Sequence, residues 1–213
     1  MEKNSAVLEL GSDFEKLQDS FRSHWIGLKF YETKPEQFAV RKHTRFCQAI
    51  ELALTEPVLI KLSDSPCAGG KYVFQNDSGA KSKLAAYLCG KKGFSKQSVE
   101  AVLAKTCCLP HKYAYAGFNT DERKPDFAIS FMSPEGMTSF IEAYNAKTGK
   151  NLSCELAGFM SVCGECAAKS MAHDIVTISF GSEEARKFSG LSERAVVCVP
   201  AKMIKLFIRS AKP

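Results

Sequence analysis

The sequence predicts a single compact domain of the α/β or α+β class, built on a mixed sheet. Apolar runs of strand length alternate with helical periodicities along the whole chain, and no low-complexity linker divides it. A chain of 213 residues is long enough to bury one substantial core without disulfides. Hydrophobic residues make up 45% of it, a share typical of globular proteins. We therefore expect residues 1–213 to form one domain.

The first part of the chain predicts a helix followed by strand, helix and strand. Phe14, Leu17 and Phe21 form an apolar stripe at helical spacing, and Thr44 is a candidate cap for the second helix. In order, we expect a helix over 14–21, a strand over 25–31, a helix over 44–54, a strand over 57–62, a Gly-rich turn over 63–70 and a short strand over 71–74.

The second part continues the alternation. Ser133 and Pro134 are typical of a helix start, and Gly149 of a helix end. In order, we expect helices over 80–88 and 96–105 separated at Gly90 and Gly93, an aromatic strand over 113–118, a polar turn over 119–124, a strand over 126–132, a helix over 133–149, a strand leading into a Cys-containing turn over 154–169, a strand over 174–180, a short helix from 182, a strand over 195–199 and a final helix from 200 to 207.

Two stretches, residues 25–75 and 126–180, share a weak internal repeat of strand, helix, strand and Cys-containing turn. If the two units pair about a pseudo-two-fold axis, Cys67 and Cys163 occupy equivalent turns, and cysteines from both halves meet at one place. A chance likeness between the two stretches is the alternative.

The chain has nine cysteines: Cys47, Cys67, Cys89, Cys107, Cys108, Cys154, Cys163, Cys166 and Cys198. The first residues carry no secretory signal pattern, which points to a reducing cytoplasm where structural disulfides are rare. An odd, high count in that setting favours metal or redox roles. Cys89 and Cys198 lie in apolar runs and are expected to be core residues.

The central motif is Cys163-Gly-Glu-Cys166, because a Cys-x-x-Cys turn holds two soft ligands close together. We expect Cys47, Cys67, Cys163 and Cys166 to ligate an iron–sulfur cluster such as [4Fe–4S], with Cys154 in reserve. Zinc, or no metal at all, is the alternative. Among the histidines, His173 lies nearest to this motif in sequence, although a lone histidine there is more often a surface or core residue.

Two other kinds of function stay open. Cys163 and Cys166 can cycle between dithiol and disulfide, or Cys67 can act as a nucleophile. Alternatively, Gly69, Gly70 and Arg45 bind a flat or anionic cofactor, in a pocket to which Tyr113 and Tyr115 contribute unless they pack in the core. A domain with incidental reactive thiols would need no cofactor. The motifs do not decide whether the protein is an enzyme.

The net charge of +6 comes from scattered lysines rather than an Arg- and aromatic-rich patch, so we expect no nucleic-acid partner. No apolar run approaches the ~20 residues of a membrane span, so no membrane is expected either. The remaining partners are a redox protein or a small-molecule cofactor. The oligomeric state, substrate and reaction stay open.

Several motifs resemble the uncharacterised ArCR-type family, also called domain of unknown function one hundred sixty-nine, of archaea and anaerobic bacteria. They are Trp25 to Phe30, Arg45-Phe46-Cys47-Gln48-Ala49, Cys67-Ala68-Gly69-Gly70, the Cys163-Gly turn and Phe180-Gly181. The family often has Gly before this last cysteine and Arg after it, whereas Val162 precedes Cys163 here, and no Arg follows. The resemblance implies one fold from about Trp25 to Phe207, a cytoplasmic setting and a link to anaerobic metabolism, without an established activity.

Overall fold

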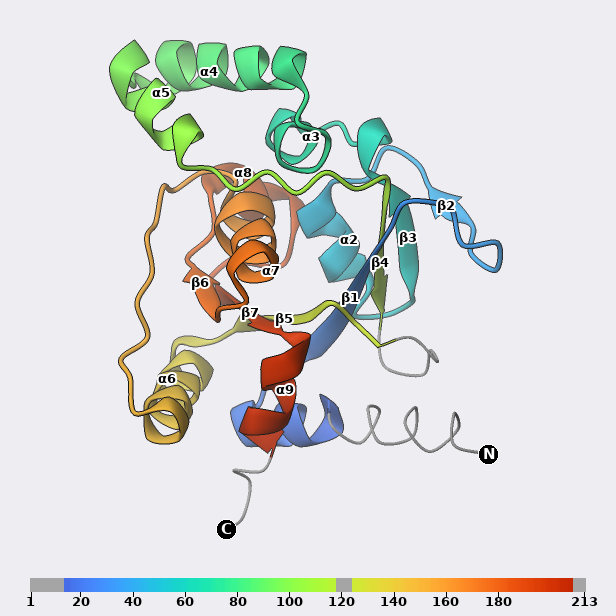
Figure 1. The fold of residues 1–213 in the computed structure, drawn as a ribbon, viewed down its shortest axis with the longest axis vertical. Coiled ribbons are helices and arrows are strands. Elements are labelled where there is room, and N and C mark those ends of the chain that lie inside the picture. The colour runs from blue at the N-terminus through green and yellow to red at the C-terminus, as the bar shows by residue number, and fades with distance from the viewer. Residues whose placement is uncertain (1–13, 118–123, 209–213) are drawn as a thin grey trace.

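A seven-stranded sheet forms the centre of the computed structural model, which describes residues 14–117 and 124–208 (Figure 1). Its strands are β1 (Trp25–Tyr31), β2 (Val40–Arg41), β3 (Val58–Lys61), β4 (Tyr113–Gly117), β5 (Phe127–Met132), β6 (Thr177–Ser179) and β7 (Ala195–Pro200). The strand order is β2-β3-β4-β1-β5-β7-β6. Only β2 and β3 pair in parallel, so the sheet is mixed, as the sequence predicts.

Helices cover both faces of this sheet. They comprise a helix over residues 14–21, α2 (Phe46–Leu52), α3 (Ala68–Gln75), α4 (Ser78–Lys92), α5 (Lys96–Ala104), α6 (Pro134–Thr148), α7 (Lys169–His173), α8 (Glu183–Phe188) and α9 (Ala201–Ile208), with a 3-10 turn η1 (Leu62–Asp64) and a π-helix η2 (Ser161–Ala168). The chain is thus a single compact domain of mixed α/β class, which confirms the predicted fold class. Within the described ranges, no helix combines the length and the apolar character that crossing a membrane requires.

The sheet separates two apolar layers. Along β1, Ile26, Leu28 and Phe30 point into the layer that contains α2, α3 and η2, whereas Trp25 points into the opposite layer. That second layer is closed by the first helix, α6 and α9, and Figure 1 shows these helices together below the sheet. The fold therefore places the elements that carry most of the cysteines on one face.

The capping signals predicted for α6 and the start of α8 predicted at residue 182 are confirmed. The Ser133 hydroxyl accepts a hydrogen bond from the Gly136 N–H at 3.2 Å, Pro134 occupies the first helical position, and Gly149 ends α6 with φ of 65°. The Ser182 hydroxyl likewise accepts from the Ala185 N–H at 3.1 Å. These local signals depend on neighbours in sequence, which is why they were readable from it.

Three elements differ from their predictions. Residues 71–74 belong to α3 and form no strand, because Cys67 caps that helix and its apolar residues fill the core. Gly90 lies inside α4, which continues to Gly93. The Thr44 hydroxyl donates to the Lys42 carbonyl at 3.1 Å, so α2 begins after Arg45 without a side-chain cap.

The strand predicted at the start of residues 154–169 is also absent. Residues 151–160 form no strand, and residues 161–168 are π-helical. The reason is local: the Glu165 carboxylate accepts hydrogen bonds from the backbone N–H groups of Ala157 and Gly158. A side chain thus satisfies donors that a strand would present to a neighbouring strand.

The sheet order bears on the internal repeat. The sheet order is symmetric about the β1–β5 pair: β4 and β7 lie next to this pair, and β3 and β6 lie one strand further out. In this arrangement β3 corresponds to β6. Cys67 follows β3, however, whereas Cys163 precedes β6. The two cysteines therefore do not occupy equivalent turns in this order. Phe118 and residues 119–123 of the predicted turn lie outside the described residues.

We predict that Phe140→Ala lowers the free energy of unfolding by roughly 3–5 kcal/mol, because a fully buried aromatic leaves a cavity. Phe140 is 0% exposed, and its ring centroid lies 4.9 Å from that of Phe207. As a control, Phe180→Ala removes a ring that is 56% exposed, and its effect should stay within about 0.5 kcal/mol. Urea unfolding of both variants tests this, and equal losses would contradict the described packing.

Candidate functional site

Three of the four predicted cysteine ligands line one cavity of about 390 Å³. Cys47 lies in the first turn of α2, Cys67 at the N-terminus of α3, and Cys163 in η2. The three groups are close enough to interact: besides burial, which is the largest cause, Cys67 raises the pKa of Cys47, and Cys67 and Cys47 both raise the pKa of Cys163. Three elements that are far apart in sequence thus bring three thiols together.

Backbone N–H groups surround these sulfur atoms. The Cys67 sulfur accepts a hydrogen bond from the Gly70 N–H at 3.5 Å. The N–H groups of Cys47 and Gln48 lower the pKa of Cys47, and those of Cys163 and Gly164 act in the same way on Cys163. Donors of this kind stabilise a thiolate once it forms.

Burial outweighs these donors for two of the thiols. Burial, followed by the charge of Cys67, raises the pKa of Cys47 from 9.0 to about 11, although Arg45 lowers it. Burial likewise raises the pKa of Cys163 well above 9.0. Both thiols therefore hold their protons at neutral pH unless a cation takes the place of the protons.

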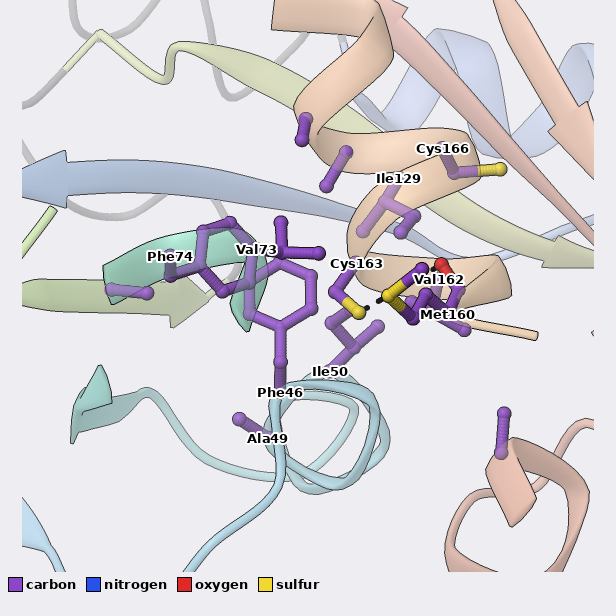
Figure 2. Close-up of a cluster of buried hydrophobic side chains, with 14 of the residues drawn as sticks. Phe46, Ala49, Ile50, Val73, Phe74, Ile129, Met160, Val162, Cys163 and Cys166 are labelled. Atoms are coloured by element: carbon purple, nitrogen blue, oxygen red, sulfur yellow. Dashed lines mark hydrogen bonds between the residues drawn. The ribbon is translucent and has the colours of Figure 1, made fainter. Parts of the chain in front are cut away.

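Cys166 does not join this group. Its thiol donates to the Val196 carbonyl at 3.8 Å, whereas the Cys163 thiol donates to the Met160 carbonyl at 3.7 Å. Figure 2 shows the two sulfur atoms pointing away from each other. The wider turn of a π-helix separates positions i and i+3 more than an α-helix does, so the Cys-x-x-Cys motif does not converge. Cys154, the reserve ligand, is exposed and does not line the cavity either.

The three residues predicted to bind a cofactor all line the cavity. A Cβ atom at Gly69 would lie only 2.9 Å from the Met160 Cγ, so this position has no room for a larger residue. Gly70 supplies the N–H donor to Cys67. Arg45 pairs with Glu184 at 3.7 Å and lies over the Phe188 ring at 3.7 Å, and thereby joins α2 to α8.

Elements that the sequence did not connect to the site complete the cavity. Its apolar walls are Leu84, Leu88, Phe94 and Phe159, and its polar rim includes Lys83, Tyr87, Lys92, Glu183 and Glu184. Lys187 and Lys92 hydrogen-bond Glu183 and hold its pKa at about 2, so the rim carries paired charges. The rim side chains come from α4 and α8, and no motif in the sequence links the two helices to the cysteines.

The two tyrosines that were candidates for lining a cofactor pocket lie away from this cavity. Tyr113 and Tyr115 belong to β4, and neither lines the cavity. Tyr115 is 5% exposed, and its ring centroid lies 4.6 Å from that of Phe38. Tyr115 therefore packs in the core, which was the alternative to a cofactor wall, whereas Tyr113 is half-buried.

Outside this cavity, Cys107 lies close to a histidine. The Cys107 sulfur is 3.3 Å from the His173 Nε2, and Cys107 lines a separate cavity of about 390 Å³ with Lys105, Glu165 and Lys169. Burial raises the pKa of Cys107, and Lys169 lowers it. Phe159 and Met160 line both cavities.

The donor set suits some metals better than others. Among residues 14–117 and 124–208, no group of three or more His, Cys, Asp or Glu side chains is arranged to hold one metal ion. A tetrahedral zinc site is therefore not preformed in this part of the chain. In a [4Fe–4S] cluster each cysteine binds a different iron atom, so the thiolates surround the cluster rather than a single ion. Cys47, Cys67 and Cys163, which line one cavity, are of the residue type that such a cluster takes as ligands.

Comparison with known proteins gives one match. A family model described as "Uncharacterised ArCR", domain of unknown function one hundred sixty-nine, matches residues 20–209. The match includes Cys47, Cys67 and Cys163. No curated protein and no solved structure matches the chain.

We predict that alkylation of Cys47 by iodoacetamide in the metal-free protein keeps accelerating up to about pH 11, because its pKa is raised to about 11. At neutral pH the thiolate fraction should be about 100-fold lower than for a thiol with a pKa of 9.0. Peptide mass spectrometry after timed alkylation gives the rates. The urea-unfolded chain is the control, and its rate should level off near pH 9; the same midpoint in both states would refute the prediction.

Proposed function

We propose that this chain, which belongs to the uncharacterised ArCR family, binds an iron–sulfur cluster through Cys47, Cys67 and Cys163. The observation that carries the proposal is the meeting of three thiols, from three separate elements, at the wall of one cavity. Thiolates are the usual protein ligands of such clusters.

The surroundings of the three sulfurs support this ligand set. Each sulfur faces at least one backbone N–H, a donor that stabilises a thiolate and tunes the potential of a bound cluster. The raised pKa values of Cys47 and Cys163 mean that binding must release protons. Cluster uptake should therefore become more favourable as the pH rises.

Three cysteine ligands distinguish this site from an ordinary electron-transfer site with four. A [4Fe–4S] cluster held in this way supplies either electron transfer or one iron atom free to bind a small molecule. The protein supplies a cavity of about 390 Å³ beside the thiols, which falls within the ~300–1,000 Å³ of small-molecule pockets. Several of its walls are apolar, and two ion pairs at its rim, Arg45 with Glu184 and Lys92 with Glu183, connect α8 to the start of α2 and to α4.

The cellular setting follows from this chemistry. The described cysteines are all free, as is usual in reducing compartments, and this supports a proposed place in the cytoplasm of an anaerobe, with a redox protein or a small molecule as the partner. The thiol-redox alternative receives less support, because the Cys163 and Cys166 thiols donate to carbonyls on different sides of η2.

We predict that the protein, reconstituted with iron and sulfide under anaerobic conditions, is brown and contains acid-labile sulfide. The variants Cys47→Ala, Cys67→Ala and Cys163→Ala should each lose most of the iron, because a two-cysteine site does not retain a cluster. Iron and sulfide analysis with visible spectroscopy gives the loading, and circular dichroism checks the fold.

Cys166→Ala is the matched control, because Cys166 lies on the same π-helix and points away from the cavity. Cys89→Ala is a second control on α4. Both should retain the cluster. A colourless wild-type protein without iron would refute the cluster, and loss of iron in a folded Cys166→Ala variant would refute this ligand set.

A further inference from the structure

Met160 combines an unusual backbone conformation with a place beside the three thiols. It has φ of 52° and ψ of 30°, in the left-handed region that a residue with a long side chain rarely adopts. Its side chain is 9% exposed and lines both the thiol cavity and the neighbouring cavity. Strain of this kind often marks a functional position, and it persists only where the surroundings hold the residue in place.

Hydrogen bonds fix the backbone of Met160. Its carbonyl accepts from the N–H groups of Gly164 at 2.7 Å and Glu165 at 3.1 Å, and the Cys163 thiol donates to the same oxygen. The Glu165 carboxylate binds the loop just before Met160 and also accepts from the Ser179 hydroxyl at 2.6 Å. Hydrogen bonds to the residues before and after Met160 therefore fix the direction in which its side chain points.

Two glycines make room for the side chain. A Cβ atom at Gly69 would lie 2.9 Å from the Met160 Cγ, and one at Gly164 would lie 3.2 Å from the Met160 Cβ. The Met160 sulfur and the Cys67 sulfur each lie 3.8 Å from the Cβ position at Gly69. The Cys163 thiol donates to the Met160 carbonyl at 3.7 Å, the dashed bond in Figure 2. The Met160 side chain thus lines the same cavity as the three thiols, with its sulfur on the side of Gly69 and Cys67.

We propose that the Met160 thioether is an exchangeable fourth ligand, bound to the iron atom that the three cysteines leave free, and that a small ligand entering the cavity displaces it. This inference rests on the proposed function. Thioethers are soft donors of the kind that iron–sulfur sites accept. A thioether is also neutral and weak, so a stronger donor can replace it without any transfer of electrons or protons.

The second cavity gives the displaced side chain somewhere to go. Met160 forms part of the wall between the two cavities, and each has a volume of about 390 Å³. A methionine side chain has three rotatable bonds, so it can turn from one cavity to the other while its backbone stays fixed. If Met160 only filled space, a leucine of similar volume would serve equally well.

The test uses full-length protein labelled with selenomethionine and reconstituted with iron and sulfide. Selenium-edge X-ray absorption should show an iron neighbour at bonding distance. The chain has 6 methionines, so the signal corresponds to about one-sixth of an iron atom per selenium. The signal should vanish in Met160→Leu, whose iron and sulfide content should match that of the wild type. It should also vanish when cyanide is added to the wild-type protein as a strong competing ligand.

The outcomes separate the two proposals. A wild-type protein without a cluster refutes the proposed function, and this inference with it. A loaded cluster without an iron neighbour at selenium overturns the role of Met160 alone. An iron neighbour that persists in Met160→Leu assigns another methionine, and one that survives cyanide shows that the ligand does not exchange.

A second set of variants keeps the inference testable if Met160→Leu folds poorly. Met160→Gly removes the thioether at a position whose positive φ suits glycine, and should also abolish the signal. Gly69→Ala should weaken the signal, because its Cβ forces the Met160 side chain to move. Gly70→Ala is the matched control, since its Cβ would meet its nearest neighbour at an ordinary 3.7 Å. Equal signals in Gly69→Ala and Gly70→Ala would contradict the proposed position of the thioether.

Discussion

The carboxylate of Glu165 is the interaction on which the arrangement of the cavity most depends. It accepts hydrogen bonds from the loop at residues 157–158 and from Ser179, next to the end of β6. These bonds replace the strand pairing that the loop would otherwise need, and they leave Met160 and Cys163 at the start of a π-helix instead of on the sheet. The Glu165 side chain thus fixes the conformation of the turn that positions the Cys163 thiol on the same side as Cys67.

Burial sets the chemical character of two of the three thiols. Cys47 and Cys163 lie against the apolar layer above the sheet, where losing a proton is costly unless a positive ion compensates. The same apolar layer keeps these two thiols unreactive in the metal-free protein, because protonated thiols are poor nucleophiles and are oxidised slowly.

Much of the fold was predictable from the sequence, and much of the site was not. Strands β1 and β5 and the capped helix α6 follow from local signals, such as an apolar run or Ser133 followed by Pro134. The π-helix could not be predicted, because it depends on contacts between Glu165 and residues seven and eight positions earlier. The same holds for Cys166: its spacing from Cys163 suggests a pair, yet only the width of the turn decides where its sulfur points. The meeting of Cys47, Cys67 and Cys163 was expected from a repeat, but the sheet order brings them together by a different route.

The distribution of the three thiols along the chain has a consequence for biogenesis. Cys47 and Cys67 belong to the first half of the chain, and Cys163 arrives with the last third. A nascent chain therefore has no complete ligand set until nearly all of it has been synthesised and the central sheet has closed, since β6 and β7 follow Cys163. A cofactor held by these residues would act as a long-range cross-link that stabilises only the completely folded chain. The cofactor would then be inserted after folding, through the open side of the cavity. Before insertion, the protonated thiols would pack against their apolar neighbours like other core side chains.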